Sequence, residues 1–486
     1  MLHFTIGTVL ESIPINNKNL RTKNLRMGSQ RIVGLDLVKG IGIFMMIIVH
    51  AVTQVIADYD GSVFFSIKDK IPKPLLYCIV YPLMIVGLWG TVFTMVTGIT
   101  TSLSAIRIMK NNKRAFIPYL LQRWIFLVFL RLGECITVAF GSEAADPFNN
   151  KQFQLPPLSF GGPATTLDSI GWSGIISPLL IFCLYPLIKL NKPILVIVVF
   201  SCLSYLFFAV SPFVVRLFTI VTNFFAEHHM GLIADISGKI ALGRFKIAET
   251  SPFMAIGAMY GVLISYGLSV NVLYKLSYVY FVLGIAIFAV WLLIDPSFLD
   301  ALVSEDVPLP AQIISFGCIC LLLFVHTIFV DGDRQIEKKL KSRKRVTYLL
   351  RLGMLSLTVF CIGSWVGKQL SLPWQIFFGP PCTHSPPTLL WSVWVCIAFA
   401  VFLVLCWIGI SILWEKVDFK CSMEHILGWI LSKLFGREYK PNNRALVYGP
   451  AEELEKGTSV GGESCVEIGK GLLSEEVTID TGANAL

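Results

Sequence analysis

Charged residues are scarce in this chain of 486 residues, where Asp, Glu, Lys and Arg together make up 15%. Globular domains average about 25%. Hydrophobic residues make up 55% and gather in long blocks, without the short-range alternation that membrane barrels show. The scarcity of charge excludes an ordinary soluble domain, and the blocks predict helices that cross a membrane.

Several motifs of soluble enzymes and metal proteins are also missing. The sequence has no Walker loop, no Rossmann glycine pattern, no Gly-x-Ser-x-Gly and no His-Glu-x-x-His, which argues against nucleotide hydrolysis and the common hydrolases. Its twelve cysteines show no Cys-x-x-Cys and no spacing typical of zinc ligands, so we expect neither metal nor disulfides. Residues 1–31 lack the apolar core of a signal peptide, so the first span should remain as an uncleaved anchor.

The apolar blocks predict an all-α fold, a polytopic membrane helix bundle of about ten transmembrane helices. Each block is long enough to cross a bilayer at about 1.5 Å per residue. The predicted spans cover residues 32–57, 83–106, 115–140, 168–189, 193–211, 251–268, 275–295, 308–330, 346–367 and 388–414.

Basic residues fall on alternate connections between these spans. The connections 107–114, 189–192 and 331–345 all carry lysine or arginine, whereas the connections between them are poorer in basic charge or contain acids. Short basic loops stay on the cytoplasmic side, so this pattern predicts a multi-pass protein with both termini in the cytoplasm. The same bias explains the net charge of +9, and we expect no nucleic-acid partner.

The chain divides by composition into four parts. They are a basic cytoplasmic segment (1–31), a transmembrane domain (32–414), an inner-surface segment with an amphipathic helix (415–440) and a disordered polar tail (441–486). Two outward connections, 141–167 and 212–250, are long enough to cover a binding site. The second is apolar enough to predict an interfacial helix.

His50 is the first candidate for chemistry, because a titratable ring inside a membrane span costs free energy to insert. Imidazole can take a proton from a hydroxyl or an amine near neutral pH. A histidine that only joins neighbouring helices is the alternative. Asp36 and Lys39 form a charged pair at the start of the same span.

Charged side chains in the third and fourth spans are further candidates. Arg131 and Glu134 lie three residues apart and so share a helix face, where they could bind substrate or form an internal ion pair. Arg123, nearer the cytoplasm, could meet an anionic ligand or reach lipid phosphate. Asp168 opens the fourth span, where a helix cap is the alternative to a binding role.

The first span resembles the opening helix of a large group of integral-membrane acyltransferases, which includes the acyltransferase-3 proteins and the heparan-α-glucosaminide N-acetyltransferase family. That group has Leu-Asp-x-x-Arg-Gly, with a histidine eleven positions after the arginine. Here residues 35–40 read Leu-Asp-Leu-Val-Lys-Gly, and His50 follows Lys39 by eleven. Weaker similarities follow in the same order at residues 93–98, 119–123, 167–171 and 352–360. Lys39 replaces the arginine, and Gly363 falls where many relatives carry a polar residue or histidine.

The resemblance implies an acyltransferase-like domain over 32–414 that moves an acyl group, acetyl foremost, from cytoplasmic acyl-CoA to a hydroxyl or amine. His50 would be the general base, and Lys39 and Arg123 would bind the donor acetyl-CoA. Asp36, Arg131, Glu134 and Asp168 would serve substrate binding. The expected partners are membrane lipid and a glycan or lipid acceptor, and a homodimer is left open.

Two other functions stay open on the sequence. A transporter or flippase of the same architecture would line its path with His50, Arg131 and Glu134, although no internal repeat of the kind found in many transporters is visible. An inactive relative that serves as a structural partner is the third reading.

Overall fold

The computed structural model describes residues 33–57, 63, 73–75, 90–141, 164–243, 245–295, 312–320, 346–384 and 386–436. These residues are helical almost throughout, which confirms the predicted all-α bundle. Eight helices in this part of the chain are long and apolar enough to cross a membrane, and a ninth span results if one bent pair counts as a single span. The chain is therefore a multi-pass membrane protein. The predicted segments 1–31 and 441–486 lie outside the described residues.

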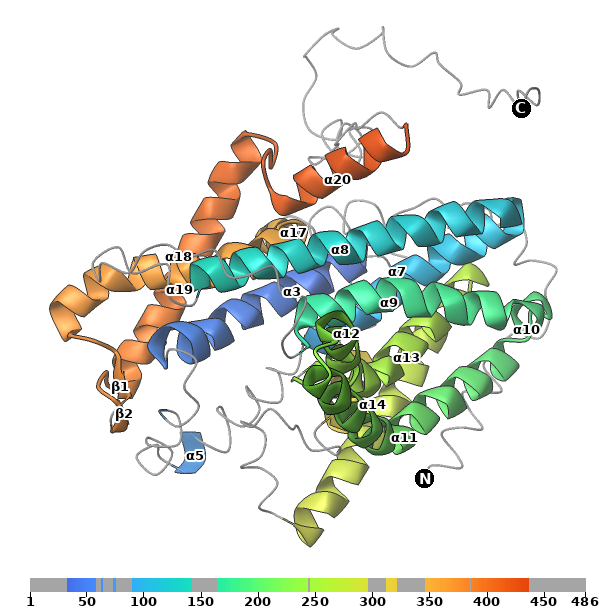
Figure 1. Cartoon of the computed structure of the whole chain (residues 1–486), viewed down its shortest axis with the longest axis horizontal. Coiled ribbons are helices and arrows are strands. Elements are labelled where there is room, and N and C mark those ends of the chain that lie inside the picture. The colour runs from blue at the N-terminus through green and yellow to red at the C-terminus, as the bar shows by residue number, and fades with distance from the viewer. Residues whose placement is uncertain are drawn as a thin grey trace, which may run out of the picture.

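One group of helices gathers around an apolar core that includes Ile43, Val359 and Trp407. It lies on the left in Figure 1. Its members are α3 (Val33–His50), η1 (Ala51–Ile56), α17 (Thr347–Met354), α18 (Ser356–Phe378) and α19 (Val393–Lys416). The strongest contact within this group joins α3 to α17, so the first span, which carries the motif at residues 35–40, is held by a helix from far along the chain.

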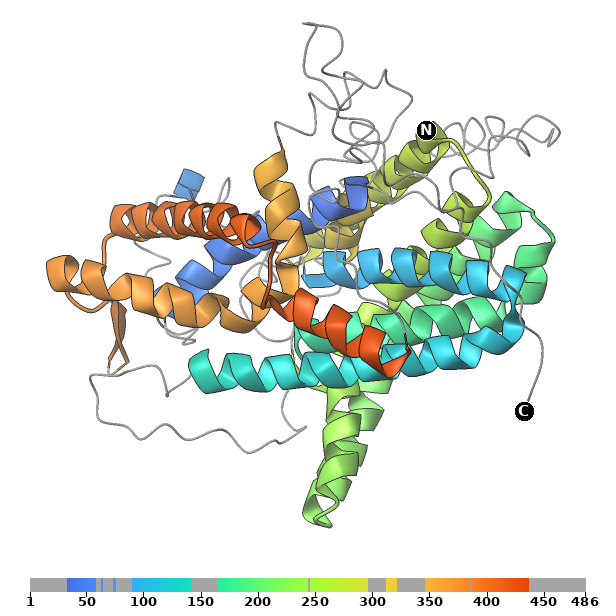
Figure 2. The same ribbon diagram turned by 90° about the horizontal axis from the view of Figure 1, so that it is seen from above.

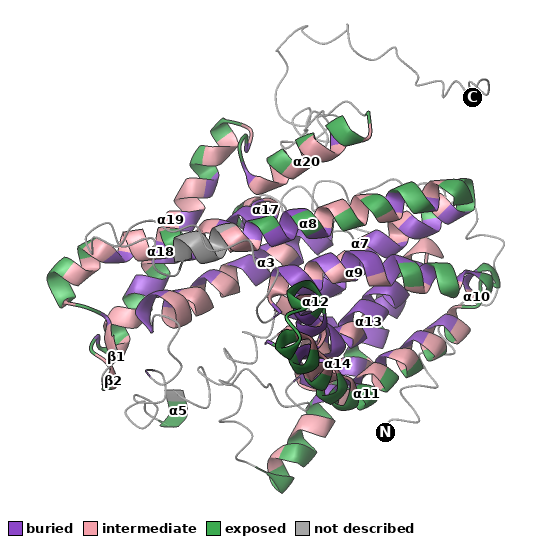
Figure 3. Cartoon of the chain, viewed as in Figure 1, coloured by how far each residue is buried: buried purple, intermediate pink, exposed green. Residues whose placement is uncertain are grey.

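A second group lies on the right in Figure 1 and packs around α13, whose residues are buried almost throughout (Figure 3). Its members are α7 (Gly90–Asn111), α9 (Thr166–Cys183), α10 (Tyr185–Lys189), α11 (Pro193–Glu227), α12 (Gly231–Ala241), α13 (Ile247–Ser265) and α14 (Val270–Ile294). The long helix α8 (Phe116–Gly141) packs against α9 in this group and against α18 in the other. It therefore connects the two groups.

Small and hydroxylated residues bring α7, α9 and α13 close together. A Cβ added at Gly257 would lie 2.5 Å from the carbonyl oxygen of Met95, so only glycine fits there. Thr94 and Ser169 share a hydrogen bond of 2.8 Å, and Ser173 donates to the carbonyl of Thr94 at 2.7 Å. Close packing through small residues with interhelical hydrogen bonds is how membrane helices associate without a hydrophobic driving force.

The remaining elements are short. A two-stranded antiparallel hairpin pairs β1 (Cys382–His384) with β2 (Pro387–Leu389), while η3 (Lys113–Ala115) and α5 (Lys73–Leu75) are single turns. The helix α20 (Met423–Leu434) follows the last span and lies across α8 (Figure 1). This helix falls within residues 415–440, where the sequence predicted an amphipathic one.

The predicted end of the fifth span at residue 211 is wrong. The helix α11 continues through Pro212 to Glu227, and α12 then runs back beside it. A proline removes only one helical hydrogen bond, and membrane helices tolerate this. Figure 2 shows the light-green end of α11 and α12 leaving the bundle as a helical hairpin. The connection 212–250 is therefore mostly helix, whereas 142–163 lies outside the described residues.

The predicted ninth and tenth spans also need correction. Residues 346–367 do not form one straight helix, because α17 and α18 meet at Leu355 at an angle of 87°. The tenth span begins at Val393 rather than 388, since residues 387–389 belong to β2 and Ser392 caps the helix. Of the predicted span 308–330, only 312–320 is described, and it is helical.

Candidate functional site

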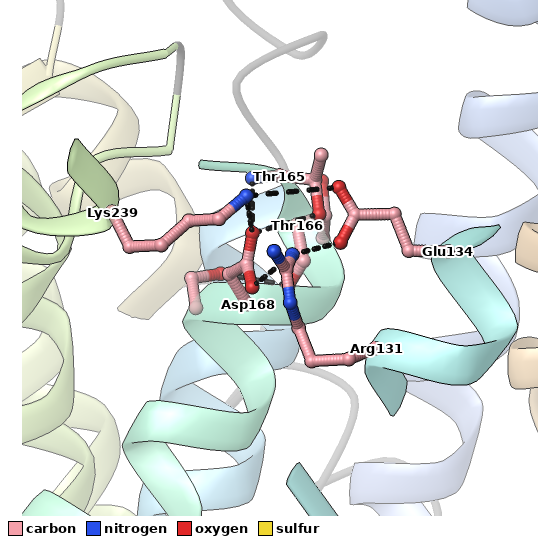
Figure 4. A network of polar contacts seen from close by, with 7 residues as sticks. Arg131, Glu134, Thr165, Thr166, Asp168 and Lys239 are labelled. Carbon is pink, nitrogen blue, oxygen red and sulfur yellow. Dashed lines mark hydrogen bonds and ion pairs between the residues drawn. The ribbon is translucent and has the colours of Figure 1, made fainter. Parts of the chain in front are cut away.

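A network of four charged side chains lies where α8, α9 and α12 meet (Figure 4). Arg131 Nη1 lies 2.6 Å from Asp168 Oδ1 and also pairs with Glu134 on its own helix. Lys239 Nζ of α12 lies 3.2 Å from Asp168 Oδ2 and 4.0 Å from Glu134 Oε1. The structure therefore joins three of the residues predicted to bind substrate and adds a lysine.

Asp168 holds its place through the start of α9. Thr165 is the N-cap of this helix, and its backbone N–H donates to Asp168 Oδ2 at 2.9 Å in a capping box. The predicted cap role is therefore correct in kind, although the aspartate sits in the first turn rather than at the N-cap. The same carboxylate thus caps the start of the helix and forms ion pairs with two cations, Arg131 and Lys239.

The network is mostly buried and balanced in charge. The side chain of Asp168 is 1% exposed and that of Lys239 is 6% exposed. Two cations face two carboxylates, which is the arrangement that makes buried charge tolerable in a membrane protein. Lys239 is not among the site residues predicted from the sequence, although a lysine inside the largely apolar run 231–241 was a usable signal.

His50 lies at a change of helix type. It is the last residue of α3, and the next six residues form the π-helix η1. Its side chain is partly buried. Short π-helical segments inside α-helices are frequent at functional sites. The position singled out by the sequence therefore coincides with a local departure from the α-helix.

The π-helical segment packs closely on α18. Ser364 donates a hydrogen bond to Gln54 Oε1, four residues after His50. A Cβ added at Gly367 would lie 2.7 Å from Val55, so α18 approaches as near as glycine allows. Ser364, the residue after Gly363, thus places a polar side chain of α18 beside the end of the motif span.

The Asp36–Lys39 pair lies at the opposite end of α3. Lys39 Nζ is 3.4 Å from Asp36 Oδ1, and the lysine side chain is 28% exposed. The motif glycine Gly40 faces α17, where an added Cβ would collide with the carbonyl of Leu349. A Cβ at Gly353 would likewise collide with the carbonyl of Asp36. These two glycines allow α3 and α17 to touch backbone to backbone.

Arg123 lies on α8, four residues after Tyr119 and on the same face of the helix. Its guanidinium carbon is 4.9 Å from the centroid of the Tyr119 ring, a cation–π contact. The Tyr119 hydroxyl donates to the carbonyl of Thr101 at 3.0 Å, which fixes the ring. Among the residues that the structure describes, the buried Nε of Arg123 has no hydrogen-bond partner, so this cation keeps capacity for an anionic ligand.

The predicted site residues thus fall into separate places. Arg131, Glu134 and Asp168 meet in one network, Asp36 and Lys39 form a pair at the start of α3, and His50 ends the same helix. Within the part of the chain that the structure describes, no group of three or more His, Cys, Asp or Glu could hold a metal ion. Comparison of the chain with protein-family models, curated proteins and solved structures finds no match.

Proposed function

We propose that this protein is a membrane acyltransferase. It moves an acyl group, acetyl in the simplest case, from acyl-CoA to a hydroxyl or amine of a glycan or lipid acceptor. The observation that carries the proposal is the position of His50, which stands at the α-to-π change of the span whose start carries the motif at residues 35–40. Sequence motif and local geometry select the same residue independently.

The chemistry needs one general base. The His50 imidazole takes the proton from the acceptor hydroxyl or amine as the acceptor oxygen or nitrogen attacks the thioester carbonyl carbon. The new ester or amide bond forms, the carbon–sulfur bond breaks, and the imidazolium returns its proton to the CoA thiolate. Attack by His50 itself, to give a transient acyl-imidazole, is the covalent variant of the same step.

The donor would enter from the cytoplasmic side. We place both termini on that side, in agreement with the basic residues of connection 107–114. Lys39 and Arg123 then face the CoA phosphates, and the buried Nε of Arg123 supports this role. His50 follows Asp36 by fourteen positions along the helix, which corresponds to about 21 Å. A donor with a long flexible arm is suited to such a distance.

The ion network would serve the acceptor side. Arg131, Glu134 and Asp168 are paired with one another and with Lys239, so we assign them to holding α8, α9 and α12 in place around the acceptor. Glu134 is less buried than Asp168, so its carboxylate is the one left to contact substrate. Lipid covers the apolar side chains exposed on α11, such as Leu206, Phe213 and Leu217.

A transporter or flippase is the second candidate, and the same network favours it. Ionisable residues inside a membrane domain often mark ion and substrate pathways. In that function Arg131, Glu134 and His50 line a path and no acyl donor is needed. The completeness of the pairing weighs against it, because a pathway needs charges that are available to the solute.

The experiment that separates the two uses the full chain in liposomes with acetyl-CoA enclosed on one side. Release of free CoA thiol is followed while amino sugars, neutral sugars or lipid head groups are offered on the other side. The acyltransferase requires thiol release that depends on the acceptor. Uptake of a solute without donor, with no thiol release for any acceptor, would establish the transporter instead.

A further inference from the structure

The first turn of α18 has no cap from its own neighbourhood. Leu355, which separates α17 from α18, is the N-cap residue and has no side-chain acceptor. The first N–H groups of a helix have no partner within the helix, and leaving them unpaired in an apolar setting is unfavourable. The bend of 87° between α17 and α18 therefore needs an acceptor from elsewhere.

Glu424 of α20 supplies that acceptor. Its Oε1 accepts from the backbone N–H of Leu357 at 2.5 Å and of Thr358 at 3.2 Å. Its Oε2 accepts from the Thr358 hydroxyl at 2.6 Å, and Thr358 Oγ1 in turn accepts from the backbone N–H of Met423 at 2.9 Å. Each helix thus caps the other, as in a capping box formed between two separate segments.

The connection from α19 to α20 is shaped to hold α20 in this position. Three residues of the turn, Asp418, Phe419 and Cys421, have positive φ angles of 61°, 54° and 65°. Non-glycine residues adopt this conformation only where surrounding contacts impose it. Here the Trp414 indole donates to the carbonyl of Lys420 at 2.7 Å, and Phe419 is buried. The turn folds the chain back onto the bundle.

Apolar contacts complete the attachment. Met423, Leu427 and Ile430 of α20 pack on a small cluster that includes Phe129 of α8 and Cys361 of α18. The Cys361 side chain is 1% exposed. Because α20 covers this cluster, the reactivity of the Cys361 thiol reports whether α20 is in place.

We propose that α20 is a detachable latch, and that Glu424 is the positioning residue through which it holds α17 and α18 in their bent arrangement. When α20 leaves, the first turn of α18 loses its acceptor and the bend loses its support. The helix α17 ends at this bend and carries Gly353, which touches Asp36 of the motif span. Attachment of α20 therefore sets the geometry of the donor end of α3, a consequence that rests on the proposed function.

The experiment measures labelling of individual cysteines in the full-length protein with N-ethylmaleimide, resolved by mass spectrometry. Cys361 is the reporter, the exposed Cys421 is the reactive reference, and the buried Cys320 in the other helix group reports general unfolding. The variants are Glu424→Ala and Glu424→Gln. Lys433→Ala, an exposed change on the same helix, is the control.

We expect Glu424→Ala to raise the labelling rate of Cys361 at least about tenfold while Cys320 stays protected, which corresponds to about 1.4 kcal/mol. Glu424→Gln keeps Oε1 as an acceptor and should give a smaller rise, and Lys433→Ala none. If Glu424→Ala also exposes Cys320, this variant is partly unfolded, and the labelling of Cys361 in Glu424→Gln decides instead. Unchanged Cys361 labelling in a folded Glu424→Ala or in Glu424→Gln overturns the latch.

A second readout tests the link to donor binding. In Glu424→Ala the KM for acetyl-CoA should rise several-fold while kcat at saturating donor is retained, and Glu424→Gln should restore most of the loss. A KM that does not follow the Cys361 labelling overturns the positioning role. Because labelling needs no turnover, the latch is still decided if the protein has no acyltransferase activity.

Discussion

Lys239 and Asp168 form a buried ion pair, with the ammonium nitrogen 3.2 Å from Oδ2, although they belong to helices far apart in the chain. The pair fastens the hairpin of α11 and α12 to the start of α9. Two backbone hydrogen bonds lie beside it, from Ala164 to Leu242 at 2.8 Å and from Phe245 to Ala164 at 3.4 Å. The ion pair and the two backbone hydrogen bonds thus fix the same junction between α12 and the start of α9.

Removal of one partner of this pair should destabilise the fold strongly. Lys239→Met leaves Asp168 and Glu134 with a single cation, and an uncompensated buried charge costs about 3–5 kcal/mol. Unfolding in mixed micelles by SDS titration measures the loss. Lys192→Met, on an exposed turn, is the control and should change little.

A double-mutant cycle isolates the pair itself. Asp168→Asn combined with Lys239→Met should recover part of the loss, with a coupling free energy of about 1–3 kcal/mol. Additive effects of the two substitutions would mean that they do not interact in the folded protein.

The contact between α3 and α17 should tolerate no added methyl group. Gly353→Ala places a carbon against the carbonyl of Asp36, whereas Gly363→Ala places it 3.6 Å from Val359, an ordinary contact distance. Overpacking costs typically about 1–3 kcal/mol, so we expect that loss of stability for Gly353→Ala and little change for Gly363→Ala. Equal melting temperatures for the two variants would count against the close approach of the helices.

Lys39 gives a prediction for donor binding. Lys39→Ala should weaken CoA binding by roughly 1–3 kcal/mol, as for a lost hydrogen bond to a charged group. Lys39→Arg should preserve or tighten it, because guanidinium can bond two phosphate oxygens at once. Isothermal titration calorimetry on purified protein measures both. An unchanged dissociation constant for Lys39→Ala would leave Lys39 as a partner of Asp36 only.

Attachment of α20 should depend on pH through Glu424. Burial raises the pKa of this carboxyl above its ordinary value and outweighs the hydrogen bonds from Thr358, which lower it. A raised pKa in the attached state means that stability is present at low pH and is lost as the pH rises through that pKa. Cys361 labelling relative to Cys421 should therefore fall as the medium is acidified.

Glu424→Gln is the control for this titration, because its amide has no charge to lose. Its ratio of Cys361 to Cys421 labelling should be independent of pH over the same range. The same slope in the variant and in the parent protein would assign the pH dependence to another group.

Much of the fold could be predicted from hydrophobic blocks, because a bilayer requires long apolar segments whatever their packing. The end of α11 and the bend at Leu355 could not. The predicted end of the fifth span at residue 211 falls just before Pro212, but a membrane helix tolerates one missing hydrogen bond. The first turn after the bend is capped by Glu424, which is distant in sequence and gives no local signal.

The candidate site was predictable to a similar degree. The spacing of Arg131 and Glu134 placed them on one helix face, and the position of Asp168 suggested the start of a helix. Their contact with Lys239 could not be predicted, because it depends on the tertiary structure that returns α12 to the bundle. The π-helical segment after His50 also has no marker in its composition, because its sequence Ala-Val-Thr-Gln-Val-Ile contains neither glycine nor proline.

The most direct test of the account is acyl transfer by a His50 variant. His50→Ala and the similarly sized His50→Gln are compared with the parent protein in liposomes, with CoA release as the rate and CoA affinity measured separately. General-base catalysis contributes about 10²–10⁴-fold, so the rate should fall by at least about a hundredfold with the dissociation constant for CoA unchanged. Undiminished transfer in folded His50→Ala and His50→Gln would contradict the account.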